Sequence, residues 1–502
     1  HHHFLLQLGS VVVQNPVHSD AGYAPYISRY ACIPHASGSN DVHTSKAETM
    51  GWRPLADVDQ SDVPPATGSL VRKANNDDFE SFSLDKDDCP PLYIGHHPFD
   101  KSLTMSLRCR DSSDWNSGGW GDGKFTAIFG RNNSGKTIIL LMWLAAQLTK
   151  HPDQGCLIPD LAGDISNTDG HSKGDFSFNF LELVEGFQTV SFSDLYITDQ
   201  SAFAQQIDSY LRAANLVASS TKVGSIADLI ADALSDKLDG SGITVDEFFE
   251  AGRANCSQAF GLKKDGTPTQ AGEAAEKKFE TIRPHQKALF KTMIGDLVTG
   301  DISVKDLCHA YLNQKSRYNL KMVGALSVRD ILIREIINQT YSVITEQYKR
   351  HARTVNSILV LDEAPNYVGE GSGSDVTKML IKSVKEVRKM GLSIAFVSQS
   401  IAGFSKEVLR ECHTKLYGAN LGVGVDGGHM EQDLGKSGYD LYRRLSVRYS
   451  YFWLATGDMV NLDSGKALIP FIPWHGDVNA KLIEMNPAIW SDEFEAQVAR
   501  GK

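Results

Sequence analysis

Short apolar runs and amphipathic stretches alternate through the middle of the chain. Residues 124–129 form an apolar run that predicts a buried strand, and residues 138–146 continue as an apolar helix. Residues 357–361 and 392–399 are largely apolar, as strands covered on both faces of a parallel sheet are. Because helical stretches separate these strands, the pattern predicts an α/β fold with a mostly parallel sheet.

Residues 200–350 follow a helical spacing of apolar positions. Pro284 suits the start of a helix better than its interior, so two helices are divided there. Residues 315–321 mix cations with Tyr318 and are expected to form a solvated loop, with contact to a phosphate backbone as the alternative. The region predicts a helical insertion with helices over residues 201–214, 226–238, 245–254, 269–282, 284–297 and 304–311. A further helix over residues 327–351 leads into the strand at residues 357–361.

The two ends of the chain carry weaker patterns. Residues 1–90 are polar and rich in Ser, Asp, Gly and Pro, so they form either a small β domain or a loop-rich extension. Residues 92–95 and 103–108 predict strands, and residues 447–454 and 465–471 predict a hairpin. We therefore divide the chain into an N-terminal region (1–90), a first part of the core (91–200), a helical insertion (201–326), a second part of the core (327–475) and a C-terminal tail (476–502).

A phosphate-binding loop lies between the first strand and its helix. Residues 130–137 read Gly-Arg-Asn-Asn-Ser-Gly-Lys-Thr, the complete G-x-x-x-x-G-K-[ST] pattern in a strand–loop–helix context. Backbone N–H groups of such a loop bind phosphate oxygens together with the helix N-terminus. Lys136 would contact the β- and γ-phosphates, and the Thr137 hydroxyl would bind Mg²⁺. We expect ATP as the ligand, held by Gly130, Asn133, Ser134, Gly135, Lys136 and Thr137.

Two carboxylates follow the strand at residues 357–361. Ligands bind at the carboxyl ends of strands in open α/β sheets, and Asp362 and Glu363 emerge there. Asp362 would hold Mg²⁺ through water, and Glu363 would act as general base on the attacking water. The two motifs together predict hydrolysis of the nucleotide. Asp160 follows another apolar stretch and is either a further site residue or a turn residue.

A third motif distinguishes among the classes of phosphate-loop ATPase. The chain carries Arg-Lys-Met-Gly at residues 388–391, and the apolar strand that follows ends in Gln399. This order of motifs resembles the HerA/FtsK superfamily of ring-shaped translocating ATPases, which includes conjugative coupling and type IV secretion ATPases. The resemblance covers roughly half of the chain, about residues 90–170 and 325–475, and implies a RecA-like core. It assigns γ-phosphate sensing to Gln399 and makes Arg388 a finger in the neighbouring subunit's site. By chemistry alone, Arg388 could equally be a solvated cation at a helix C-terminus.

The resemblance also implies partners. It implies a homo-oligomeric ring, expected to be a hexamer, that hydrolyses ATP with Mg²⁺ and translocates double-stranded DNA. A separately encoded nuclease or other effector would work with it, in DNA processing or anti-phage defence. The alternative is a conjugation or type IV secretion ATPase that acts on protein partners.

The phosphate loop departs from the superfamily pattern at one place and there resembles another class of ATPase. The Arg-Asn-Asn-Ser tract at residues 131–134 is more typical of ABC-like ATPases of the nuclease-overcoming-lysogenization type. Those proteins should also carry a Leu-Ser-Gly-Gly-like signature before the Asp-Glu strand and a His after the next strand. The sequence has neither feature, and Gln399 occupies the position where such proteins would carry the His.

Composition limits the partners and the compartment. The chain has 502 residues and a net charge of −11, whereas a protein that coats DNA is usually basic. DNA binding outside a pore should therefore be weak. Seven cysteines without a C-x-x-C pair argue for a reducing cytoplasm and against a zinc site or a disulfide framework. No apolar run approaches the roughly 18 residues of a membrane span, so no integral membrane segment is expected.

Overall fold

A computed structural model gives the fold. It describes residues 10–14, 26–33, 46–54, 70–73, 92–97, 100–114, 119–132, 134–161, 163, 165, 180–217, 222–322, 326–351, 354–369, 385–418, 421, 424–448, 453–457 and 469–473. Between the strands at residues 357–361 and 392–398, residues 385–389 are described as helical. The C-terminal tail from residue 476 lies outside the described residues. Among the described helices, none is both long and apolar enough to span a membrane.

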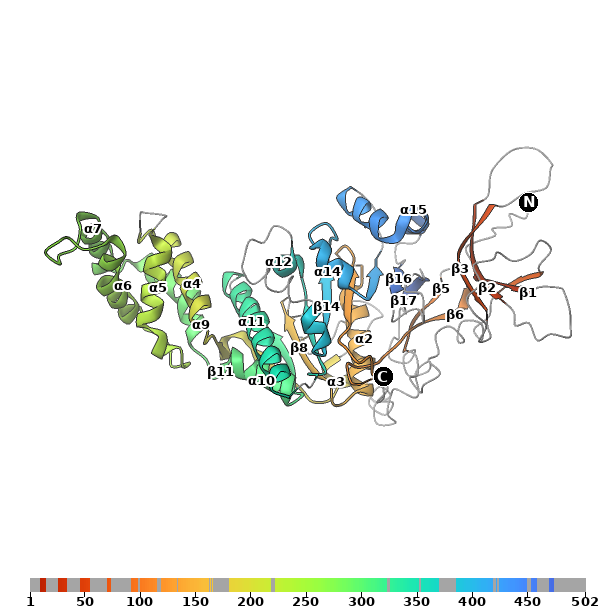
Figure 1. Ribbon diagram of the computed structural model, residues 1–502, viewed down its shortest axis with the longest axis horizontal. Helices are drawn as coiled ribbons and strands as arrows, with labels where there is room; N and C mark the ends of the chain where they lie inside the picture. Colours follow the sequence, from red (N-terminus) through yellow and green to blue (C-terminus); the bar gives the residue numbers. More distant parts are fainter. Residues whose placement is uncertain are drawn as a thin grey trace.

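An eleven-stranded sheet forms the centre of the molecule (Figure 1). Seven neighbouring strands are parallel, and four further strands extend one side in antiparallel pairs. The predicted α/β fold with a mostly parallel sheet is thus confirmed. The parallel part runs β15 (Thr414–Tyr417), β7 (Phe125–Phe129), β14 (Leu392–Ser398), β13 (Ser357–Leu361), β8 (Gly155–Asp160), β12 (Arg317–Lys321) and β9 (Phe187–Ser191). The antiparallel part runs outward from β15 through β16 (Trp453–Gly457), β17 (Ile469–Pro473), β5 (Leu92–His97) and β6 (Asp100–Leu107).

The strand order separates the two nucleotide motifs by one strand. β7 leads into the phosphate loop and β13 leads into Asp362 and Glu363, and β14 pairs in parallel with both. The residue that follows β14 therefore reaches the carboxyl edge of the sheet between the two motifs. That residue is Gln399.

Helices cover both faces of the sheet because neighbouring strand residues point to opposite sides. Ile128, Val360 and Val397 pack in one apolar cluster with helix α2 (Lys136–Lys150), of which residues 139–148 are all buried. Phe129 and Phe396 belong to the opposite cluster, which includes residues of α10 (Val304–Asn313) and α11 (Leu326–His351). Apolar side chains thus cover both faces of the sheet, and the polar site residues lie at the ends of its strands.

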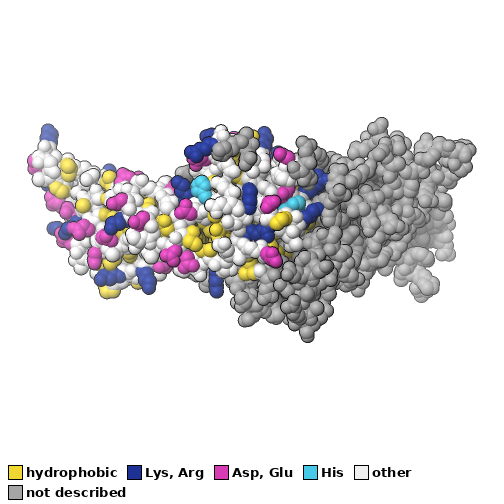
Figure 2. Space-filling view, turned by 90° about the horizontal axis from the view of Figure 1, so that it is seen from below, with side chains coloured by type: hydrophobic (Ala, Val, Ile, Leu, Met, Phe, Trp, Pro, Cys, Tyr) yellow, Lys and Arg dark blue, Asp and Glu magenta, His cyan; other side chains and the backbone are white. Residues whose placement is uncertain are grey.

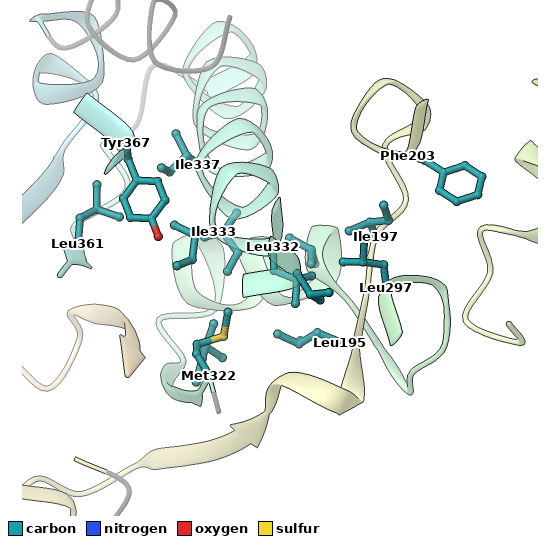
Figure 3. Close-up of a cluster of buried hydrophobic side chains, with 14 of the residues drawn as sticks. Leu195, Ile197, Phe203, Leu297, Met322, Leu332, Ile333, Ile337, Leu361 and Tyr367 are labelled. Carbon is teal, nitrogen blue, oxygen red and sulfur yellow. The ribbon is translucent and has the colours of Figure 1, made fainter. Parts of the chain in front are cut away.

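The helical insertion continues the second cluster away from the sheet. Figure 3 shows Leu332, Ile333 and Ile337 of α11, with Leu361 and Tyr367 on one side and insertion residues on the other. Helix α11 is therefore the shared wall between the core and the insertion. The insertion extends from one end of the molecule in Figure 1 and contains α4 (Gln200–Ala213), α5 (Val223–Ala233), α6 (Val245–Phe260), α7 (Gln270–Glu280), α8 (Pro284–Phe290), the π-helix Lys291–Gly295 and α9 (Asp296–Val298).

The expected loop at residues 315–321 is wrong, because residues 317–321 form strand β12 inside the sheet. Arg317 is only 7% exposed, which also excludes it from contact with a phosphate backbone. Its charge is buried because the guanidinium donates to backbone carbonyls of Leu148, His151, Pro152, Gln154 and Glu185. A core strand therefore lies within the range 201–326 that the sequence assigns to the insertion.

The N-terminal region forms a second sheet. Its strands are β1 (Ser10–Gln14), β2 (Tyr26–Ile33), β3 (Lys46–Pro54) and β4 (Leu70–Lys73), paired antiparallel in the order β3-β2-β1-β4. This favours the β-rich alternative for residues 1–90. At the other end, the predicted hairpin is present as the antiparallel pair β16 and β17, although residues 447 and 448 belong to the preceding helix.

Candidate functional site

The phosphate loop begins where β7 ends and is shaped by two glycines. Gly130 donates its N–H to the carbonyl of Ser398 at 3.1 Å, which ties the loop to the end of β14. A side chain at Gly130 would place its Cβ 2.3 Å from the Ser134 Oγ. Gly135 has φ +87°, a left-handed conformation that favours glycine, and it caps α2. The loop therefore needs glycine at both positions for steric reasons.

Two polar side chains of the phosphate loop are available to a ligand: within the described part of the chain, one has no hydrogen-bond partner, and the other bonds only to the loop itself. The Ser134 Oγ is buried without a hydrogen-bond partner among the described residues. The Lys136 Nζ donates to the Arg131 carbonyl at 3.2 Å. Burial lowers the pKa of Lys136, while the charges of Asp362 and Glu363 act to raise it. A bound polyanion would satisfy both side chains, so the loop fits the triphosphate of a nucleotide. Asn133 lies outside the described residues.

A small pocket beside the loop gathers oxygen groups from three elements. The Asp160 carboxylate is 4% exposed and accepts from the Ile165 N–H at 3.1 Å. Burial raises the pKa of Asp362, and the charge of Asp160 raises it further, although the Glu363 N–H donates to Asp362 and opposes the shift. Hydroxyl and carboxylate oxygens suit a hard cation, so Thr137 and Asp362 fit the predicted Mg²⁺. The pocket is lined by Thr137, Asp160 and Asp362 together with apolar residues that include Ile158, Ile165 and Val397.

Glu363 and Gln399 meet at the same edge. The Gln399 Nε2 donates to the Glu363 Oε1 at 2.6 Å, although the residues are 36 positions apart. Glu363 has φ +48°, a left-handed backbone that is uncommon and costly outside glycine. Such a backbone persists only where surrounding contacts hold it. In this conformation the Glu363 carboxylate contacts Gln399 at the end of β14. Gln399 itself is exposed.

Arg388 lies at the opposite edge of the sheet in its own chain. Its carbonyl accepts from the Gly123 N–H at 2.8 Å, just before β7 begins. Its guanidinium lies 2.7 Å from the His413 Nε2 and 3.4 Å from the Asp122 carboxylate. The five residues of β7 separate this position from the phosphate loop. Arg388 therefore does not contribute to the nucleotide site of its own chain.

The structure thus gathers most of the predicted site residues and separates one. Gly130, Ser134, Gly135, Lys136, Thr137, Asp362, Glu363 and Gln399 all lie along the carboxyl edge around β7, β14 and β13. Asp160, for which the sequence left a site role and a turn role open, lines the pocket. Sequence reasoning missed Ser398 and Asp426, which hold the residues next to Gln399. The serines on either side of Gln399 were a usable signal for the first, whereas Asp426 makes contacts across 24 to 26 residues that no local pattern reveals.

Comparisons with known proteins find similarity in structure alone. No protein-family model matches the chain, and no curated protein matches it. Among solved structures, it is similar to VirB4 of Thermoanaerobacter pseudethanolicus, with 12% identity and a TM-score of 0.45 over 79% of this chain and 100% of that one. It is also similar to the bacterial conjugative coupling protein TrwB, with 11% identity and a TM-score of 0.44 over 80% and 92% of the two chains.

A viral protein is a third structural match. It is B204, the DNA-packaging ATPase of Sulfolobus turreted icosahedral virus, with 11% identity and a TM-score of 0.31 over 70% of this chain and 98% of that one. The assignment of an α/β phosphate-loop fold rests on the chain's own strand order and loop.

Proposed function

We propose that this chain is a Mg²⁺-dependent ATPase of the HerA/FtsK type. The contact between Gln399 and Glu363 at 2.6 Å, beside Lys136 and Asp362, is the observation that carries the proposal. A binding protein would need the phosphate loop alone. A carboxylate that an amide orients next to that loop is the arrangement that hydrolysis requires, because a general base must be held within reach of a water.

Each side chain has a distinct task in this mechanism. Lys136 stabilises negative charge on the phosphates, and its burial strengthens that interaction. Glu363 accepts a proton from the attacking water, and Gln399 fixes the direction in which its carboxylate points. Mg²⁺, when held by Thr137 and Asp362, would neutralise charge on the phosphate oxygens. The position of Gln399 where an ABC-like protein would carry His disfavours that alternative.

Arg388 supports a ring by its location. Because it lies at the far edge of the sheet, it could contact phosphate only in the site of another subunit. Head-to-tail contacts of this kind close into a ring when the rotation between subunits is right. We propose a homo-oligomeric ring, most simply a hexamer, in which Arg388 serves the neighbouring site.

Double-stranded DNA is the substrate we propose for the motor, with a separately encoded nuclease or effector as its partner in DNA processing or anti-phage defence. Figure 2 shows cations and acids interspersed over the described part of one face, and the chain carries a net charge of −11. Contact with DNA would then be confined to a few cations in a pore. A conjugation or secretion ATPase acting on protein partners is the second candidate, favoured by the same core motifs.

The decisive experiment measures ATP hydrolysis against duplex DNA concentration across a salt series. A pore-threading motor is stimulated by duplex DNA, and the stimulation falls as salt rises because phosphate contacts release counterions. Lys136→Ala serves as the control that has lost nucleotide binding. Hydrolysis that duplex DNA never stimulates at any salt concentration would reject the DNA motor in favour of the protein-directed ATPase. No hydrolysis by the wild-type chain, with or without DNA, would reject the ATPase itself.

A further inference from the structure

One carboxylate outside the nucleotide chemistry holds the turn that follows Gln399. The Asp426 Oδ1 accepts three hydrogen bonds, from the Ser400 Oγ at 2.7 Å, the Ile401 N–H at 2.9 Å and the Ala402 N–H at 2.8 Å. All three donors belong to consecutive residues, so the turn wraps around a single oxygen. Three donors on one carboxylate oxygen make this a firm attachment.

The other side of Gln399 is attached to the phosphate loop. The Ser398 Oγ accepts from the Ser400 N–H at 3.1 Å and donates to the Ser400 carbonyl at 2.7 Å. The Ser398 carbonyl accepts from Gly130, the first residue of the loop. Gln399 therefore lies between two serines, one linked to the phosphate loop and one linked to Asp426.

Asp426 belongs to α15 (Val425–Arg448), a helix with a separate attachment to the core. Asp433, farther along α15, accepts from Lys415 and Tyr417 of β15. Gly435 interrupts the helix with φ +71°, and Tyr442 beyond it donates to the Gly418 carbonyl at 2.5 Å. Helix α15 lies above the ends of β14 and β16 in Figure 1. Asp426 thus links α15 to the turn at residues 400–402. Asp433 links the helix to β15, and Tyr442 links it to Gly418, which follows β15.

We propose that Asp426 is a positioning residue that couples the nucleotide state at Gln399 to α15. The proposal rests on the proposed ATPase function. Gln399 bonds Glu363 here, and a nucleotide at the phosphate loop offers an acceptor to the second N–H of its amide. The turn at residues 400–402 then shifts, and the three bonds to Asp426 carry the shift into the first half of α15. Asp433 and Tyr442 hold the rest of the helix on the core, so the shift acts between Asp426 and Asp433, before the break at Gly435.

Three variants test the coupling in the full chain. Asp426→Ala removes the acceptor, and we expect kcat to fall about tenfold while the Kd for ATPγS changes less than about twofold, since about 1.4 kcal/mol is lost in turnover alone. Asp426→Asn keeps an oxygen acceptor of the same shape and should restore most of kcat. Asp433→Ala detaches the same half-helix from β15 and is the matched control, with kcat expected within about twofold of wild type. All three are compared at temperatures below their measured unfolding transitions.

Hydrogen exchange of α15 supplies a readout that a merely structural role would not move. In the wild type, ATPγS should change the exchange of amides in residues 425–434, and this response should vanish in Asp426→Ala and return in Asp426→Asn. Equal losses of kcat in Asp426→Ala and Asp433→Ala would mean that docking of α15 suffices, and would overturn the coupling. Binding of ATPγS without any response in residues 425–434 would overturn this proposal alone. Absence of ATPγS binding would overturn the proposed function with it.

Discussion

The two edges of the central sheet carry similar polar side chains and use them differently. At the amino edge, the Asn356 amide accepts from the Ser112 N–H and the Gln154 side chain, and donates to Asp111 at 2.7 Å. Its bonding capacity is used within the chain. At the carboxyl edge, the buried Ser134 Oγ has no partner among the described residues. A left-handed backbone occurs at both edges, at Glu363 (φ +48°) and at Asn356 (φ +43°), but Asn adopts it more readily than Glu.

The difference shows which edge is prepared for a ligand. Buried polar groups normally bond one another, and the Asn356 network follows that rule. The Arg388 Nε and the Gln147 Oε1 near the same edge are nevertheless buried without a partner among the described residues. Groups left open at the carboxyl edge cost free energy in the absence of a ligand, which a bound nucleotide would recover. Neither a count of polar residues nor a count of unpartnered atoms separates the edges, whereas the phosphate loop with Lys136 near Asp362 and Glu363 is found at the carboxyl edge alone among the described residues.

The largest effect is expected from replacing the proposed general base at the carboxyl edge. Glu363→Gln should lower kcat by about 10³-fold, because an amide cannot accept the proton of the attacking water. The affinity for ATP should be retained, since Lys136 and the loop contact phosphate in the ground state. Steady-state hydrolysis and binding of a fluorescent ATP analogue measure the two quantities.

Lys136→Ala is the matched variant, because it should lose affinity for the analogue while Glu363 stays intact. Turnover by Glu363→Gln at the wild-type rate would remove Glu363 from the chemistry. Equal affinity in Lys136→Ala and wild type would show that the loop does not bind phosphate as proposed.

Much of this carboxyl edge could be predicted because its signals are local. Buried parallel strands such as β7, β13 and β14 appear as unbroken apolar runs, and the phosphate loop is a contiguous motif. Parallel pairing then places Asp362 and Gln399 at one edge. Strand β12 was missed because its buried positions include the polar residues Arg317 and Asn319. The carbonyls that compensate the charge of Arg317 come from residues far away in sequence. The left-handed backbone of Glu363 has no sequence signal, since Glu rarely adopts it.

A second prediction asks whether the closed amino edge is also an interface. Arg388→Ala should lower kcat about 10²-fold without changing ATP affinity, if its guanidinium stabilises the transition state in a neighbouring subunit. His413→Gln is the control, because His413 contacts Arg388 only within the chain. That variant should retain kcat within a few-fold.

Mixed subunits make this test specific. Arg388→Ala and Lys136→Ala proteins are each expected to be nearly inactive, but a mixture places an intact Arg388 beside an intact phosphate loop. The mixture should therefore hydrolyse ATP faster than either protein alone. A mixture no faster than its parts, or an Arg388→Ala protein with full turnover, would assign Arg388 to the amino edge of its own chain only.

The smallest effect concerns the pH at which the amino edge stays closed. His413 faces the Arg388 guanidinium at 2.7 Å through Nε2 and the Phe125 N–H at 3.2 Å through Nδ1, and Lys124 lies nearby. Burial, followed by the charges of Lys124 and Arg388, lowers the pKa of His413 to about 3. The neutral ring can accept from one of these two donors, whereas a ring with both nitrogens protonated can accept from neither, so the neutral ring is favoured.

The sign of the pH dependence follows from that depressed pKa. The neutral ring contributes its full stability above the unfolded value of about 6.5, and the contribution is lost as the pH falls toward 3. Between pH 6.5 and 5.5 the wild type should lose about 1 kcal/mol of unfolding free energy relative to His413→Gln, as measured by urea unfolding at each pH. Parallel losses in the two proteins would mean that His413 titrates alike when folded and unfolded. The amino edge would then owe its closure to the Asp122–Arg388 pair and the Asn356 network, without any requirement for a neutral ring.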